Sequence, residues 1–444
     1  MSEWKKVKLC ELYEVHNGLS KGRQFFGTGF PFLTFSNVFN NWFLPERLES
    51  LVQTTDKERE ACSIKAGDVF ITRTSETMDE LGMSSVALKD YPNATYNGFT
   101  KRLRPITDRV NPRYIGYYLR TPKFRGQFMA FSTMTTRASL ANNDLLNMEV
   151  ELPPIEIQHR IATILSRYDA LIENYQKQIK LLEEAAQRLY KEWFVDLRFP
   201  GYENVKVVNG VPKGWKYCRI GDRYKTVLGG TPSRANSNYW GGNIPWINSG
   251  EINKLRIVCA SEMITIEGLE NSSTKLMPIH TTILAITGAT LGQVSYTEIE
   301  TCANQSVVGI IDETKLTNEY IYLNISNNIL SIVNKATGGA QQHINKDIVN
   351  DYPILIPSSF VLALFKKKVS PIFDLIKDYI YSIASLTEAR DRLLPRLMGG
   401  EINLTLSPPS PSSSLLESPR TSSVILDPPS TSSSLQAPPS SSKI

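Results

Sequence analysis

The sequence has few cysteines, and no two of them lie close together. Its five cysteines, Cys10, Cys62, Cys218, Cys259 and Cys302, form no CxxC or CxxH pair. A structural zinc site needs closely spaced ligands, and a disulfide framework needs an oxidising compartment. We therefore expect reduced, mostly buried thiols and no metal site.

Long apolar segments are also missing. The longest uninterrupted apolar runs, such as 360–365, are far too short to span a bilayer. The first fourteen residues, MSEWKKVKLCELYE, lack the apolar core of a secretory signal, so we expect a cytoplasmic protein without membrane contact. The net charge of +5 permits nucleic-acid binding without requiring it, because affinity depends on where Lys and Arg cluster.

Motifs for catalysis are absent or incomplete. No GxxxxGK[ST] loop is present, which speaks against ATP hydrolysis. An FxGxG pattern occurs at 25–29, but the polar residues before it indicate a plain turn rather than a cofactor loop. The nearest match to a methyltransferase D/N-P-P-Y/F loop, 427–430, lacks the aromatic residue. The carboxylates and lysine of 312–315 resemble a nuclease core, yet we interpret them as a solvated turn.

The chain contains an internal repeat with an offset of roughly 200 residues. The apolar stretch Asp68–Thr74 is echoed by Thr282–Gly288, and Asn111–Leu119 resembles Thr317–Leu323. Short apolar runs between Gly, Pro, Asn and Asp predict α+β domains rich in short strands. We interpret the common order of these matches as a duplication.

Each half ends in a long amphipathic pattern. Apolar residues recur at alternating intervals of four and three over 157–189, with Gln178 as a polar exception, and again over 365–397, with Arg390 as an interruption. A period of 3.5 sustained over four heptads is typical of a coiled-coil seam. A helix of about 35 residues is about 50 Å long. Such helices often join separate chains, but the duplicated flanking domains favour an antiparallel pair within one chain.

Several segments of the sequence resemble the specificity subunits of type I restriction-modification enzymes, over about residues 1–402. The segments that carry this resemblance are Thr136–Leu140, Leu152–Ala162, Leu165–Ile172, Gly229–Ser233, Tyr239–Asn248 and Ile286–Gly292. The chain departs from the family pattern where Ile157 separates Glu156 from Gln158, and where the second copy lacks the Glu-Gln pair.

The resemblance implies an α+β fold with two duplicated target recognition domains, separated by two long antiparallel coiled-coil helices in a pseudo-two-fold arrangement. The expected parts are a first recognition domain, a first spacer helix, a second recognition domain, a second spacer helix and a disordered Ser/Pro-rich tail, at 1–153, 154–198, 199–356, 357–402 and 403–444.

The function implied by the resemblance is non-catalytic recognition of double-stranded DNA. Each domain reads one half of a bipartite asymmetric site, and the helices set the gap, which is about 34–36 Å for half-sites one duplex turn apart. The implied partners are two methyltransferase subunits and the restriction subunits. No cofactor is expected in this chain, whereas S-adenosylmethionine, ATP and magnesium are expected in those partners. Charged residues of the first helix, Lys177, Lys180, Glu183 and Glu184, are candidates for the methyltransferase docking face.

Candidate DNA contacts come from polar loops whose side chains pair with base edges or phosphates. In the first domain the candidates are Arg73, Thr74, Ser75, Lys101, Arg102, Thr136, Arg137 and Ser139. In the second domain they are Thr231, Ser233, Arg234, Asn248, Ser249, Thr290, Asn304, Gln305, Gln341 and Gln342. The scattered histidines are expected to be structural, although His343 lies in a polar loop that could meet DNA.

Two other functions remain open from the residues. The chain could be the recognition part of a single-chain restriction enzyme, although both methyltransferase loops are missing. It could also be a coiled-coil scaffold that does not bind nucleic acid. The target sequence and the spacer length cannot be deduced from the chain, since DNA shape contributes to recognition.

Overall fold

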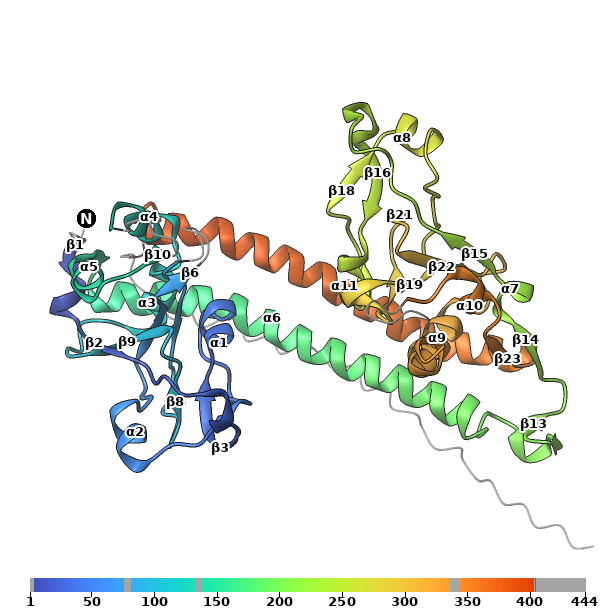
Figure 1. Ribbon diagram of the computed structural model, residues 1–444, viewed down its shortest axis with the longest axis horizontal. Coiled ribbons are helices and arrows are strands. Elements are labelled where there is room, and N and C mark those ends of the chain that lie inside the picture. The colour runs from blue at the N-terminus through green and yellow to red at the C-terminus, as the bar shows by residue number, and fades with distance from the viewer. Residues whose placement is uncertain (1–3, 76–80, 132–137, 336–342, 403, 405–444) are drawn as a thin grey trace, which may run out of the picture. The chain divides into compact units, whose positions relative to one another are not determined.

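The structure is a computed structural model that describes residues 4–75, 81–131, 138–335, 343–402 and 404 (Figure 1). Its contacts divide the chain into two units, 1–402 and 403–444. The Ser/Pro-rich tail lies almost wholly outside the described residues, so its predicted disorder stays a prediction. Among the described helices, none combines the length and apolar character needed to cross a membrane.

The first half forms a mixed domain around a four-stranded sheet of order β2-β9-β5-β7 and a three-stranded sheet of order β4-β3-β8. A separate pair, β1 with β11, joins the start of the domain to its end. Its strands are β1 (Lys5–Lys8), β2 (Tyr13–Asn17), β3 (Phe26–Leu33), β4 (Leu51–Val52), β5 (Val69–Thr72), β6 (Thr74–Ser75), β7 (Ser84–Val86), β8 (Thr95–Tyr96), β9 (Thr100–Pro105), β10 (Ala138–Ser139) and β11 (Glu149–Leu152). Its helices are α1 (Phe35–Asn40), α2 (Asp56–Ala61), α3 (Pro112–Tyr118), α4 (Pro122–Phe131) and α5 (Asn142–Asn147).

The second half repeats this plan with a five-stranded sheet of order β15-β22-β19-β20-β17, a three-stranded sheet of order β18-β16-β21, and the pair β14 with β23. Its strands are β12 (Val207–Val208), β13 (Val211–Pro212), β14 (Lys216–Arg219), β15 (Lys225–Leu228), β16 (Trp240–Ile247), β17 (Arg256–Ile257), β18 (Glu262–Ile264), β19 (Thr282–Ala285), β20 (Val294–Thr297), β21 (Cys302–Ala303), β22 (Val307–Ile311) and β23 (Pro353–Ile356). Its helices are α7 (Ile220–Arg223), α8 (Ile266–Glu270), α9 (Asn318–Val333) and α10 (Lys346–Asn350).

The duplication extends to individual hydrogen bonds. The Tyr114 hydroxyl of α3 donates to the Glu151 carbonyl of β11 over 2.7 Å. At the equivalent place in the second half, the Tyr320 hydroxyl of α9 donates to the Leu355 carbonyl of β23. Both tyrosines are fully buried, so each hydroxyl needs a partner inside the core. The prediction that the two halves share one α+β plan is confirmed.

Two long helices complete the unit. Helix α6 (Ile155–Tyr190) continues into a π-helical turn at Lys191–Val195. Helix α11 (Ser359–Met398) continues through Pro371 and Pro395, and Gly399 is its C-cap. Near the start of α6, the buried Gln158 accepts from the Asn111 amide and donates to the Arg109 carbonyl, over 2.9 and 3.0 Å.

The two helices lie side by side and run antiparallel (Figure 1). Asp169 of α6 contacts Arg390 of α11, Tyr175 stacks on Tyr379, and beyond α6 the Phe194 ring lies 4.8 Å from Phe365. Across these three contacts, the residue numbers rise along α6 and its extension and fall along α11, as they do in antiparallel helices. The predicted pairing of the helices within one chain is therefore present in the structure.

The buried face of α6 differs from the predicted seam. Leu171 and Ala185 belong to the predicted stripe but are exposed, whereas Leu165, Ala186 and Tyr190 lie one position away from it and are buried. The Tyr190 hydroxyl accepts from Asn324 of α9 over 2.8 Å, which shows that the second half's mixed domain also packs on this helix. Because two partners pack on α6, its buried face is wider than a helix–helix seam alone.

Three smaller predictions are corrected by the structure. Residues 25–29 are not a plain turn: Phe26 begins β3, whose pairing with β4 shifts register between Phe26 and Phe30. Within the predicted solvated turn at 312–315, residues 313–315 are exposed, but Asp312 is buried and accepts from the Thr317 amide over 2.8 Å. The thiols are not mostly buried, because Cys10 and Cys259 are exposed.

Candidate nucleic-acid interface

In the first domain, loops from separate parts of the chain meet beyond the ends of β5 and β9. The Gly98 amide donates to the Leu19 carbonyl over 2.9 Å, and the Arg73 amide donates to the Phe99 carbonyl over 3.0 Å. Strand β6 pairs with β10, which places Thr74 opposite Ser139. We call these segments the first contact face and define it as 19–20, 73–75, 97–99 and 138–139.

Two candidates of the first domain are buried behind this face. Lys101 is 4% exposed and donates its ammonium to Asn142 of α5. Burial, and then the nearby positive charge of Arg73, lower the pKa of Lys101. Arg102 is 2% exposed and donates to the Ser63 carbonyl over 2.7 Å. Both side chains are engaged inside the domain, while Thr136 and Arg137 lie outside the described residues.

In the second domain, a corresponding set of loops meets beyond β19 and β22. The Gly230 amide donates to the Ala303 carbonyl over 2.8 Å, and the Asn304 amide donates to the Ile247 carbonyl over 3.0 Å. The Thr231 hydroxyl donates to the Gln305 side chain over 2.6 Å. We define the second contact face as 230–234, 248–249, 287–290, 304–306 and 343.

The remaining candidates of the second domain have defined local roles. Arg234 is exposed, lies over the Trp240 ring at 3.6 Å, and forms two hydrogen bonds with Glu262. The Ser233 carbonyl accepts from the Trp240 ring nitrogen over 3.2 Å.

Loop ends fix three more candidates. Asn248 caps a short 3-10 helix that begins at Ser249, and its side chain accepts from the Gly250 amide over 2.8 Å. The Thr290 hydroxyl lies 3.3 Å from the Thr287 carbonyl. Gln341 and Gln342 lie outside the described residues.

The two contact faces occupy equivalent backbone positions. The Arg73 amide donates to the Phe99 carbonyl just before β9, and the Ile286 amide donates to the Ser306 carbonyl just before β22. The carbonyls of Arg73 and Ile286 accept from the amides of Leu140 and Ile344, respectively. The bridge between Thr287 and His343 matches the pairing of Thr74 with Ser139. Asn97 and Asn304 each accept, through the side chain, from the amide two residues later.

Sequence reasoning missed Phe99. Its side chain is 56% exposed, although its loop is held by the Asn97 side chain, which accepts from the Phe99 amide over 2.6 Å. Single exposed apolar side chains are common on protein surfaces, so Phe99 becomes a candidate contact through its place in the first contact face. The Asn-Gly turn just before it was the available signal, because such a turn at the end of a strand presents the next side chain outward.

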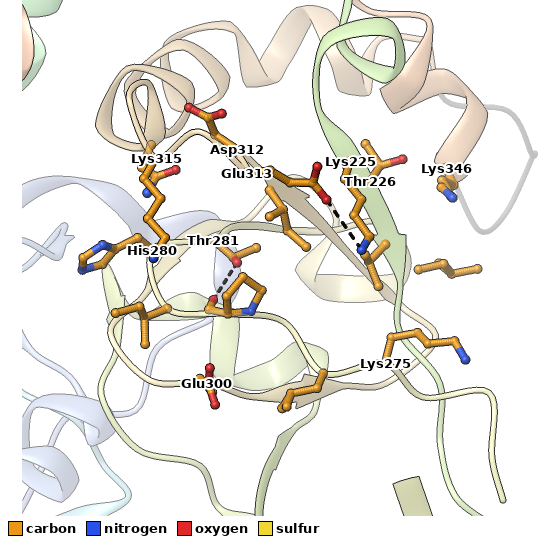
Figure 2. A pocket seen from close by; sticks show the side chains of 17 residues that line it. Lys225, Thr226, Lys275, His280, Thr281, Glu300, Asp312, Glu313, Lys315 and Lys346 are labelled. Atoms are coloured by element: carbon orange, nitrogen blue, oxygen red, sulfur yellow. Dashed lines mark hydrogen bonds and ion pairs between the residues drawn. The ribbon is translucent and has the colours of Figure 1, made fainter. Parts of the chain in front are cut away.

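A groove lies elsewhere on the second domain (Figure 2). It measures about 1120 Å³ and has Lys225, Lys275, Lys315 and Lys346 around an apolar floor. Lys225 is 3.8 Å from Glu313. The groove reaches Ile311, the end of β22 opposite the second contact face, so it is separate from that face. No group of three potential metal ligands occurs among the described residues.

Comparison with known proteins identifies the family. The model of the type I restriction modification DNA specificity domain matches residues 1–184 and 212–378. The chain belongs to this family. A curated relative, the type I restriction enzyme MjaIX specificity subunit of Methanocaldococcus jannaschii, is 27% identical, with 90% of this chain and 94% of the relative covered. The HindI specificity subunit of Haemophilus influenzae is 25% identical, with 90% and 100% covered.

A solved structure shares the fold of this specificity chain. The crystal structure of a type I restriction-modification S subunit from M. genitalium matches with a TM-score of 0.55 and 13% identity, over 89% of this chain and 96% of that one. Specificity subunits are the non-catalytic components of type I systems, so the predictions of the family and of a non-catalytic role are confirmed.

Proposed function

We propose that this specificity subunit reads a bipartite site in double-stranded DNA, with one contact face on each half of the site. The observation that carries the proposal is the occurrence of two equivalent faces on one chain, each carried by a domain that packs against the same antiparallel helix pair. One helical turn of duplex between half-sites is about 34–36 Å, and a helix of 36 residues, such as α6, spans about 54 Å.

The two faces carry different side chains at equivalent positions, which supports an asymmetric site. At the backbone positions of Arg73 and Phe99, the second domain has the buried Ile286 and, in its contact face, Ser306. The second face adds Thr231 and Gln305, whose hydroxyl and amide groups can pair with base edges. Two halves with different donors and acceptors read different base sequences.

The partners proposed for the chain are two methyltransferase subunits and the restriction subunits of the same complex. Methyl transfer and ATP-dependent cleavage then take place in those subunits, with S-adenosylmethionine, ATP and magnesium, in the cytoplasm. Lys177, Lys180 and Glu184 on α6 are exposed and stay candidates for methyltransferase docking. Glu183 is not available for docking, because its carboxylate accepts hydrogen bonds from Arg256 and Tyr322 within the chain.

The domain boundaries belong to the same proposal. Residues 1–153 and 199–356 are proposed as the recognition domains, 154–198 and 357–402 as the spacers, and 403–444 as a tail without a recognition role.

Methylome sequencing of cells with and without the chain tests the function. With the methyltransferase subunit present in both cultures, one bipartite adenine-methylated motif is expected to disappear when the chain is removed. If every methylated motif persists, the proposal is wrong.

The two rival functions are separated by in vitro assays. A single-chain enzyme would transfer a labelled methyl group to DNA without partner subunits, and we expect no transfer. A scaffold would give gel shifts that do not depend on DNA sequence, even with the partner subunits present at physiological salt.

A further inference from the structure

Arg390, the polar interruption of the second helix stripe, joins three parts of the fold. Its guanidinium lies 2.7 Å from the Oδ1 atom of Asp169 on α6, and its side chain is only 14% exposed. It also lies over the Trp42 ring of the first domain at 5.2 Å. An arginine within an apolar seam is costly unless it is paired, and here a carboxylate and a ring face pair it.

The same carboxylate continues into the first domain. The second oxygen of Asp169 accepts from the Tyr117 hydroxyl of α3. Tyr117 is fully buried, with its ring packed between Trp42 and Phe43 at 5.7 and 5.2 Å. Burial, together with the carboxylate, raises the pKa of Tyr117, so the phenol stays a donor at neutral pH. We call Arg390, Asp169, Tyr117 and Trp42 the first clasp.

The second domain has a cluster of the same chemistry. Arg256 of β17 has no exposed side-chain area and lies 3.2 Å from Glu183 of α6. The Tyr322 hydroxyl of α9 donates to that carboxylate over 2.9 Å. The Phe373 ring of α11 lies 4.3 Å from the guanidinium. These four residues form the second clasp, in which the arginine comes from the recognition domain instead of from a helix.

The two clasps are spaced along one helix. Asp169 and Glu183 are separated by about four turns of α6, or about 21 Å, and therefore lie on nearly the same side of it. Apolar packing is non-directional and allows a domain to rock on the helices, whereas charge-assisted hydrogen bonds fix an orientation.

We propose that the two clasps fix the orientation of the recognition domains on the helix pair and thereby determine how many base pairs between the half-sites are accepted. The proposal rests on the proposed reading of a bipartite site. One added base pair shifts a half-site by about 3.4 Å and rotates it by about 35° about the duplex axis. A domain must reorient on the helices to follow that change, and the clasp opposes the reorientation. Arg390 is thus a positioning residue that does not itself contact DNA.

The test compares Arg390→Met with wild type in the complex with methyltransferase subunits. Affinity is measured for duplexes that carry the natural spacer, one base pair fewer and one base pair more. We expect the variant to bind the natural site nearly as wild type does. The ratio of its affinity for the natural spacer to its affinity for an altered spacer should be about tenfold smaller than in wild type. The penalty for a base change within either half-site should stay the same, which a general loss of folding would not produce.

Two further variants keep the proposal falsifiable. Tyr117→Phe retains the buried ring and removes only the donor to Asp169, so it should relax spacer discrimination in the same direction. Arg392→Met serves as the matched control, because that side chain is 80% exposed on the same helix and pairs with Glu388 four residues before it.

The possible results distinguish a failure of the clasp proposal from a failure of the proposed function. If Arg390→Met and Tyr117→Phe discriminate between spacers as wild type does, or weaken all duplexes by one common factor, the clasp proposal is overturned. If the wild-type complex itself ignores both half-sites, the proposed function fails instead.

Discussion

Tyr175 of α6 and Tyr379 of α11 stack on each other with ring centroids 4.8 Å apart and planes 23° apart. This contact joins the two helices between the first and second clasps. Residues from opposite halves of the chain, far apart in sequence, thus pack within one molecule. Substitution of these two tyrosines therefore measures how much their contact contributes to the helix pairing.

A double-mutant cycle on this pair should show coupling. Stacked aromatic rings contribute about 0.5–1.5 kcal/mol beyond the area that they bury. We expect Tyr175→Ala and Tyr379→Ala together to cost less than the sum of the single changes by that amount, as measured by urea unfolding. Strict additivity would show that the rings do not interact in solution.

Removal of Arg256 should be strongly destabilising. Arg256→Met removes the guanidinium that faces the carboxylates of Glu183 and Glu298, and the side chain of Glu298 is only 4% exposed. Loss of one partner from a buried ion pair costs about 3–5 kcal/mol. Chemical denaturation followed by fluorescence measures the change. Arg392→Ala, at an exposed ion pair on α11, should stay within about 0.5 kcal/mol of wild type.

The two contact faces should be separable by mutation. Phe99→Ala is expected to weaken binding to the DNA half read by the first domain, and Gln305→Ala to weaken binding to the other half, each by about 1–3 kcal/mol. Competition between duplexes that are randomised in one half-site measures which half each variant affects. A variant that relaxed both halves equally would argue against independent reading.

The exposed and buried thiols should react at different rates at neutral pH. Burial raises the pKa of Cys302 to about 11 and also raises that of Cys62, whereas Cys10 and Cys259 are exposed. Because the thiolate is the reacting form, a raised pKa and burial both slow modification. Maleimide labelling at pH 7, followed by mass spectrometry of peptides, should modify Cys10 and Cys259 well before Cys302. Equal rates would contradict the burial of β21.

The helices could be predicted from the sequence because their signal is local and repeated. The 3.5-residue period over 157–189 and 365–397 requires an apolar partner, and Gly399 ends α11 as glycines commonly do. The wider buried face of α6 could not be predicted, because Tyr190 contacts Tyr320 and Asn324 of α9, which is distant in sequence.

The contact residues were harder to predict for a related reason. Lys101 and Arg102 were predicted in a polar loop, yet both lie on β9, and Arg102 donates to the Ser63 carbonyl, a partner that no local pattern reveals. Arg390 likewise interrupts the predicted apolar stripe. Its partner could not be predicted, because Asp169 lies on the other helix. The loop residues Thr231, Asn304 and Gln305 were brought together by the fold, and their contact with DNA stays a prediction.

Cross-linking tests the central claim, that the two helices pair within one chain and hold two recognition domains. In a chain with Cys10 and Cys259 replaced by Ser, Tyr175→Cys and Tyr379→Cys are joined with a short bis-maleimide in the assembled complex. The account predicts an internal cross-link at the mass of one chain, formed without loss of sequence-specific DNA binding. Cross-links that appear only between two chains, at twice that mass, would contradict it.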